Sequence, residues 1–205
     1  MIIHDCEQGT DEWKLFRSTI PTGSNFKKLI TDKGIESKSI DDYAIDLAAA
    51  KFIGQPVDGF TGSKYMDRGT ELEPEAVCDY EMKMQVNVDF VGFITNDIKT
   101  YGCSPDGLVG NDGSIEVKCS SAKEHIKILI DHKRTGQIPS HYFAQPQGVM
   151  LVAERKWCDL VFYHPDLPGL IVRQYPDNNF LTVLKKQLKS VIIKRNVILK
   201  QLEQM

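Results

Sequence analysis

Residues 104–118 read SPDGLVGNDGSIEVK. The Gly-Asn-Asp-Gly segment at 110–113 separates two short β-prone runs, which is a strong signal for a β-hairpin. A turn centred in this segment places Asp106 opposite Glu116, within one or two positions, and directly opposed side chains have Cβ atoms about 4.5–5.5 Å apart. Glu116 and Lys118 point to the same side because side chains alternate along a strand. The sequence therefore predicts two carboxylates and one ammonium group in a small volume.

Two carboxylates at this distance repel each other unless one is protonated or a cation lies between them. Oxygen ligands without a nearby His or Cys suit Mg²⁺ or Mn²⁺, and the backbone carbonyl of Val117 adds a third oxygen to Asp106 and Glu116. Lys118 can then act on a water molecule or neutralise a phosphate, as metal-assisted attack on a phosphodiester requires. The alternative is an ordinary hairpin with a surface Asp-Lys pair, and this short pattern alone does not separate the two.

Composition sets broad limits on the chain. Its 205 residues and 41% apolar content suffice for one domain spanning 1–205. The net charge of -3 does not indicate nucleic-acid binding, so a DNA-binding surface must come from local positive clusters. The five cysteines lack C-x2-C spacing and predict reduced thiols, not a zinc ribbon or a disulfide framework. We find no signal peptide or membrane-length apolar run and expect a soluble cytoplasmic protein without membrane association.

Near the N-terminus, Thr10 or Asp11 can cap a short helix from which Arg17 leaves the last turn. A Gly-Ser turn then precedes a helical pattern at 26–30, and such a turn beside an arginine is suited to binding an anion. The alternative is that Ser24 only caps the helix, and the local sequence favours that alternative.

A longer helix is predicted from about Tyr65 to Met84. By its 3.6-residue period, Glu73 lies on the apolar face with Val77 and Tyr80. A carboxylate on a buried face must be paired, protonated or bound to a metal, so Glu73 is a candidate third acid. The alternative is a glutamate that the helix dipole favours near an N-terminus.

The remaining elements follow from periodicity and from Gly and Pro positions. The basic loop and the basic last helix either contact phosphate or a partner, or are simply solvated. We expect a helix at 39–52, a strand at 85–95, a helix through 126–130, a basic loop at 133–139, a helix from Ser140 to about Glu154, strands at 157–163 and 170–175, and a basic helix at 178–204.

This order of elements and motifs resembles the PD-(D/E)XK nuclease superfamily, and more narrowly the lambda exonuclease / YqaJ-type viral recombinase family of phage alkaline exonucleases. The resemblance spans most of the chain and rests on order and spacing together. Its segments are Trp13 with Arg17, Ser24, RGTELE at 68–73, CSPDGL at 103–108, EVKC at 116–119 and AQPQ at 144–147. It implies an α/β fold with a restriction-endonuclease-like core, in which helices flank a mixed central β-sheet.

The resemblance also implies a role for each matching residue. Asp106, Glu116 and the Val117 carbonyl hold Mg²⁺, for which Mn²⁺ can substitute. Glu73 lies beside the metal, and Lys118 acts on the nucleophile.

The other matching residues are implied to bind substrate. Arg17 and Ser24 match positions that grip the 5′-phosphate of the digested strand, with Trp13 in the same group. Ser104 contacts the DNA backbone or supports the hairpin, Gln145 lines the active site, and Met66 matches an apolar wedge between the separating strands.

The implied activity is 5′-to-3′ digestion of one strand of linear double-stranded DNA to mononucleotides. It leaves a 3′ single-stranded overhang for phage-type recombination by single-strand annealing. The implied protein is a homotrimeric ring in the cytoplasm of a bacterial host, encoded by a phage or prophage, and it works with a single-strand annealing protein. Two alternatives remain, namely another PD-(D/E)XK endonuclease or a catalytically silent DNA-binding or assembly module.

Overall fold

The computed structural model describes residues 1–57 and 64–205, with the side chains of 64–68 and 70 outside the description. In chain order its elements are β1 (Ile2–His4), α1 (Asp11–Thr19), the 3-10 helix η1 (Gly23–Lys28), α2 (Ile40–Ile53), α3 (Lys64–Met84), β2 (Phe93–Thr95), β3 (Gly102–Cys103), β4 (Gly107–Val109), β5 (Gly113–Lys118), α4 (Ala122–Thr135), the 3-10 helix η2 (Ser140–Tyr142), α5 (Ala144–Val152), β6 (Trp157–Phe162), β7 (Leu170–Gln174) and α6 (Asn178–Glu203).

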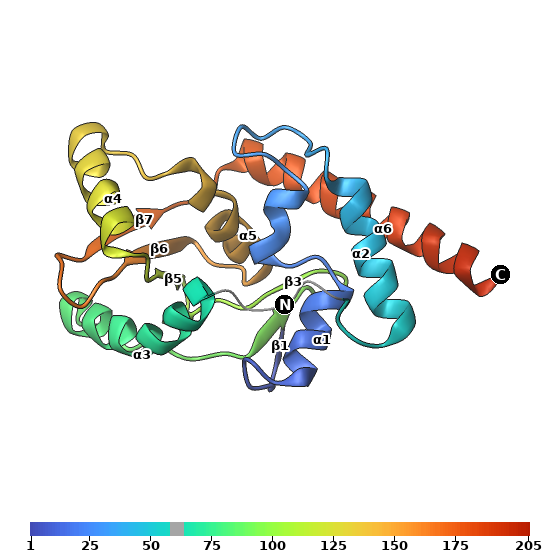
Figure 1. Ribbon diagram of the computed structural model, residues 1–205, viewed down its shortest axis with the longest axis horizontal. Helices are drawn as coiled ribbons and strands as arrows, with labels where there is room; N and C mark the ends of the chain where they lie inside the picture. The colour runs from blue at the N-terminus through green and yellow to red at the C-terminus, as the bar shows by residue number, and fades with distance from the viewer. Residues whose placement is uncertain (58–63) are drawn as a thin grey trace.

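The strands within residues 1–57 and 64–205 form two sheets. Strands β1, β2 and β3 make a small antiparallel sheet, and the second sheet has the order β4-β5-β6-β7. In the second sheet β5 and β6 are parallel, whereas β4/β5 and β6/β7 are antiparallel. The α/β class with a mixed sheet flanked by helices is therefore confirmed. Helices α3 and α4 lie on either side of β5, β6 and β7 (Figure 1).

The predicted hairpin is β4–β5. Gly107 pairs with Ile115 and Val109 with Gly113, and Gly110 closes the turn with φ +53°. Asp106 directly precedes β4, so continuing the register by one pair sets it opposite Glu116.

Successive side chains of β5 and β6 point to opposite faces of the second sheet, and both faces are buried. Val117 and Val161 pack with Val77 and Tyr80 of α3 on one face. On the other face, Leu160 and Phe162 pack with Ile128 of α4. The helix that carries Glu73 is thus fixed against the strand that carries Glu116 and Lys118.

A larger apolar core joins η1, α2, α5 and α6, which lie side by side in Figure 1. Phe26 of η1 is fully buried against Gly148 of α5. A Cβ atom at Gly148 would lie 2.1 Å from the Phe26 ring, so glycine allows η1 to seat directly on α5.

The structure corrects several predicted boundaries. Of segment 85–95 only Phe93–Thr95 forms a strand, and 133–135, predicted as loop, complete α4. The helix predicted from Ser140 begins instead at Ala144, which places Pro146 in the first helical turn, where its missing N–H costs no intrahelical hydrogen bond. The helix at 26–30 is a 3-10 helix that starts at Gly23 and has Thr22, not Ser24, at its N-cap position.

In the part of the chain that the structure describes, none of the helices combines the length and the apolar character needed to span a bilayer.

Candidate active site

Glu116 is the centre of the candidate site. Its side chain is 0% exposed, and its Oε2 pairs with Lys118 Nζ at 2.9 Å. The same Oε2 accepts a hydrogen bond from Gln145 Nε2 of α5. The other oxygen, Oε1, is buried without a hydrogen-bond partner among the described residues. Glu116 thus has one satisfied and one unsatisfied oxygen, and leaving a buried polar atom unpaired is costly.

Asp106 is anchored to the same strand. Its Oδ2 accepts a hydrogen bond from the Val117 backbone N–H at 2.6 Å, which holds the carboxylate beside β5. The charge of Asp106 acts on both Glu116 and Glu73. The predicted meeting of Asp106, Glu116 and Lys118 is therefore present, and Glu73 of α3 is near enough for the charges of Asp106 and Lys118 to act on its carboxyl group.

The pKa values reflect this crowding. Burial, opposed by Lys118 and reinforced by Asp106, raises the pKa of Glu116 to about 7. Burial and the charge of Asp106 raise the pKa of Glu73 to about 7 as well. For Lys118, burial lowers the pKa, but Glu116 and Asp106 outweigh it, so the net shift is upward. Lys118 remains a cation while the carboxyl groups resist ionisation together.

The donor set fits a hard divalent cation. Glu116 Oε1 is an unpaired buried acceptor, Asp106 supplies a second carboxylate and Val117 a neighbouring carbonyl, all of them oxygen donors. The described residues contain no group of three or more His, Cys, Asp or Glu side chains placed to hold a metal ion, so Glu73 does not complete such a group. Two carboxylates and a carbonyl are a small set of the kind that suits Mg²⁺, which usually keeps several waters.

Two buried thiols that no sequence motif indicates also lie near Glu116. Burial and the charge of Glu116 raise the pKa of both Cys103 and Cys158 well above the usual value. Because the thiolate is the metal-binding form, these protonated thiols do not change the oxygen character of the site.

A second polar group lies next to the carboxylates. The Arg17 guanidinium lies 4.2 Å from the centre of the Trp13 ring and donates to Ser24 Oγ at 2.9 Å. Trp13 Nε1 donates to Ser104 Oγ at 2.9 Å, and Ser104 Oγ donates to the Gly92 carbonyl at 2.6 Å. Four predicted substrate-binding residues from three separate segments therefore form one connected group.

This second group is close to the first. Burial lowers the pKa of Arg17, and the charges of Glu116 and Asp106 partly oppose that shift. A cavity of about 200 Å³ adjoins both groups, because its lining includes Ser24 from the second group and Lys118 and Gln145 from the first. A neighbouring cavity of about 370 Å³ also includes Lys118 and extends towards Gly69 and Glu124.

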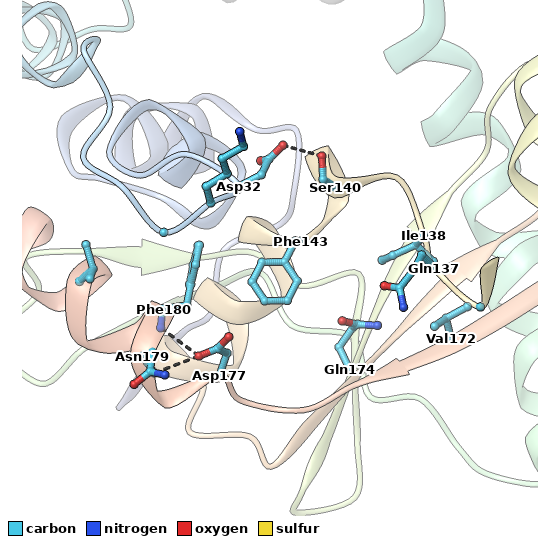
Figure 2. A pocket seen from close by; sticks show the side chains of 14 residues that line it. Asp32, Gln137, Ile138, Ser140, Phe143, Val172, Gln174, Asp177, Asn179 and Phe180 are labelled. Carbon is cyan, nitrogen blue, oxygen red and sulfur yellow. Dashed lines mark hydrogen bonds between the residues drawn. The ribbon is translucent and has the colours of Figure 1, made fainter. Parts of the chain in front are cut away.

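Figure 2 shows a larger cavity of about 500 Å³ beside the start of α6. Its two carboxylates already have protein partners. Asp32 accepts from Ser140 Oγ at 2.8 Å, and Asp177 caps α6 by accepting from the N–H groups of Asn179 and Phe180 at 2.9 and 3.0 Å. None of the predicted site residues lines this cavity, so size alone does not make it the active site.

All predicted site residues except Met66 are brought together, and the side chain of Met66 lies outside the described residues. Sequence reasoning missed Lys27, His141 and Tyr142, which line the 200 Å³ cavity. The three-residue spacing of Ser24 and Lys27 would have been a signal had a 3-10 helix been expected. Gln147 is structural, since it is fully buried and bonds the backbone at Tyr175 and Asp177.

Solved structures of exonucleases have the same fold as this chain. The chain is similar to the alkaline exonuclease LHK-Exo from Laribacter hongkongensis, with 29% identity, a TM-score of 0.81, and coverage of 95% of this chain and 97% of that one. The structure of LHK-Exo in complex with dAMP matches equally well. A phage-related exonuclease from Haemophilus somnus 129PT shares the fold, with 16% identity, a TM-score of 0.70, and coverage of 89% and 96%. No curated protein matches the chain.

The model of the YqaJ-like viral recombinase domain matches residues 12–156, more than half of the chain. The matched segment contains the hairpin with Asp106, Glu116 and Lys118, and also Arg17 and Gln145. The resemblance read from the sequence is confirmed, and the chain belongs to the YqaJ-like viral recombinase family.

Proposed function

We propose that this protein is a Mg²⁺-dependent 5′-to-3′ exonuclease that acts on linear double-stranded DNA. It degrades the 5′-ended strand to mononucleotides and leaves a 3′ single-stranded overhang for recombination by single-strand annealing. The similarity to an alkaline exonuclease solved alone and with dAMP supports nuclease activity on DNA.

One observation carries the proposal. Asp106, Glu116 and Lys118 form a carboxylate–lysine group, and Arg17 and Ser24 form a hydrogen-bonded pair. Lys118 of the first group and Ser24 of the second line the same cavity. The first group suits phosphodiester hydrolysis, and the second is a half-buried cation with a hydroxyl, which suits a terminal phosphate. Holding the terminal phosphate fixes which phosphodiester reaches the carboxylates.

In this mechanism Asp106, Glu116 and the Val117 carbonyl would hold Mg²⁺, for which Mn²⁺ could substitute. When bound, the cation polarises the phosphodiester and stabilises negative charge that develops on its oxygens. Lys118 stays an ammonium and donates to the nucleophile or the phosphate, because its neighbours raise its pKa. Glu73 positions the attacking water, and its pKa of about 7 suits proton transfer near neutral pH.

Trp13 and Ser104 support the phosphate-binding group, since Trp13 stacks on Arg17 and donates to Ser104. Gln145 orients Glu116 from α5. Met66 is proposed as the wedge between the strands. We further propose a single exonuclease domain over 1–205, a homotrimeric ring around DNA, an annealing protein as partner, and action in the cytoplasm of a bacterial host.

The test is digestion of a linear duplex labelled at one 5′ or one 3′ end, with the 5′-phosphate present or absent, beside a closed circle. The proposal expects Mg²⁺-dependent early release of the 5′ label as a mononucleotide, favoured by the phosphate and absent from the circle. Cutting of the circle would favour an endonuclease. Binding without any metal-dependent cutting would favour a silent module.

A further inference from the structure

The 200 Å³ cavity beside the candidate site contains a cation that the proposed mechanism does not use. Lys27 lines this cavity together with Ser24, Lys118 and Gln145. Lys27 is exposed and has no ion pair or hydrogen bond within the described residues. A free ammonium group at the wall of a cavity is available for an anionic ligand.

The geometry of η1 explains why Lys27 faces this cavity. A 3-10 helix has about three residues per turn, so residues i and i+3 lie one above the other. Ser24 and Lys27 are three apart in η1 and therefore share one face. The Phe26–Gly148 contact seats η1 on α5, which turns this face towards Gln145.

The adjacent lysine is placed differently. Lys28 pairs with Asp46 at 3.2 Å, and its ammonium lies 4.9 Å from the centre of the Tyr43 ring. It does not line the cavity. Two neighbouring lysines of equal charge thus differ in whether they have a protein partner, which gives a matched pair for experiment.

A terminal 5′-phosphate differs from every internal phosphate in its charge. A phosphate monoester carries about −1.5 to −2 at pH 7, whereas an internal phosphodiester carries a single negative charge. Arg17 and Ser24 alone offer one cation. We propose that Lys27 is a specificity-determining residue that binds the terminal 5′-phosphate monoester and so distinguishes a phosphorylated 5′ end from a 5′-hydroxyl end or an internal diester.

This inference rests on the proposed function, because it assigns Lys27 to the same 5′-phosphate site. The experiment compares wild type, Lys27→Met and the matched control Lys28→Met on two duplexes that differ only in a 5′-phosphate or a 5′-hydroxyl. The readout is the ratio of initial rates on the two ends. Parallel binding measurements by fluorescence anisotropy, without divalent metal, give the ratio of affinities independently of hydrolysis.

In wild type both ratios favour the phosphorylated end. Lys27→Met lowers them by roughly tenfold, as expected for one charge-assisted contact, whereas Lys28→Met leaves them at the wild-type value. Unchanged ratios in Lys27→Met, or an equal loss in Lys28→Met, would overturn the assignment of Lys27 while leaving the exonuclease intact. A wild-type ratio of one in both assays would overturn the 5′-phosphate site itself and Lys27 with it.

Discussion

Glu116 shows how a single residue is held in an unfavourable state. It is fully buried, pairs through one oxygen with Lys118 and Gln145, and has no hydrogen-bond partner for the other oxygen among the described residues. A buried carboxylate near a second carboxylate raises the pKa of the pair, and a bound cation removes that penalty. The strain at Glu116 is therefore expected to depend on both pH and metal.

The metal-free protein should lose stability as the pH rises from about 5 to 8. The unfolded chain releases the Glu116 proton near the ordinary pKa of about 4.3, whereas the folded chain keeps it until about 7. The folded state binds more protons over this interval, so the free energy of unfolding falls, by on the order of 3 kcal/mol for this group. Thermal melts in a chelator, at several pH values, measure the effect.

Glu116→Gln is the control for that prediction, because its side chain stays neutral at every pH. Its melting temperature should fall less than that of wild type between pH 5 and 8. Added Mg²⁺ should raise the wild-type melting temperature at pH 8 and leave the variant nearly unchanged. Parallel pH curves for the two proteins would contradict the role given to Glu116.

At the residue scale, the hairpin positions were predictable from the sequence, because turn chemistry and strand alternation fix Asp106, Glu116 and Lys118 relative to each other. Lys27 was not predictable, since its position depends on η1 being a 3-10 helix. The local pattern favours an α-helix from Phe26, and the Phe26–Gly148 contact that seats η1 on α5 joins segments far apart in sequence.

At the scale of elements, α3 is tied to the second sheet by two tyrosine hydroxyls. Tyr163 donates to Glu75, two residues from Glu73, and its backbone N–H donates to the Lys118 carbonyl at 3.2 Å. Tyr80, five residues after Glu75 in α3, donates to buried Asp159 at 2.8 Å. The hydrogen bond to Glu75 raises the pKa of Tyr163 to about 12, so the hydroxyl remains a donor at any working pH.

Tyr163→Phe should therefore lower the turnover rate by roughly tenfold with a stability loss near 1 kcal/mol, because it frees the part of α3 that carries Glu73. Tyr80→Phe is the control and should cost about 1–2 kcal/mol of stability with little change in turnover, since Asp159 is buried. The turnover rate and the free energy of unfolding from urea denaturation are measured for both variants. Equal turnover losses in the two, or none in Tyr163→Phe, would show that Tyr163 does not position Glu73.

Element types were largely predictable, and the helices at 40–53, 64–84 and 178–203 lie within a residue or two of their predicted ends. The buried face of α6 carries Leu184, Leu188 and Val191, and Arg195 interrupts this apolar series. The structure shows Arg195 buried and donating to the Thr19 carbonyl of α1 at 3.0 Å. That bond spans most of the chain, so no local pattern predicts it.

At the scale of the whole molecule, the protein has no net positive charge with which to attract DNA. The net charge is −3, and two cations of α6 have structural partners, Arg195 as above and Lys194 with Asp41. Exposed Lys185, Lys186 and Lys189 remain on this helix without a protein partner among the described residues. Long-lived attachment to DNA must then come from geometry more than from net charge, which the proposed ring would supply.

The ring proposal predicts a specific response to salt. Raising salt from about 50 to about 200 mM should slow loading onto DNA ends strongly, because counterions released from the DNA gain less entropy when the bulk salt concentration is higher. The number of nucleotides removed per binding event should change little, since an encircling ring does not depend on those contacts. Single-turnover digestion with a trap DNA measures both quantities, and light scattering gives the subunit number. Equal loss of both, from a monomer, would contradict the ring.

The most direct test of the central claim is Asp106→Asn, measured for hydrolysis and for DNA binding in the same buffer. We expect Mg²⁺-dependent release of mononucleotides to fall by at least about a thousandfold, as when a catalytic carboxylate is lost. Affinity for a 5′-phosphorylated duplex should remain within about threefold of wild type, because the Arg17–Ser24 group is untouched. Hydrolysis at the wild-type rate in Asp106→Asn would contradict the assignment of this cluster as the active site.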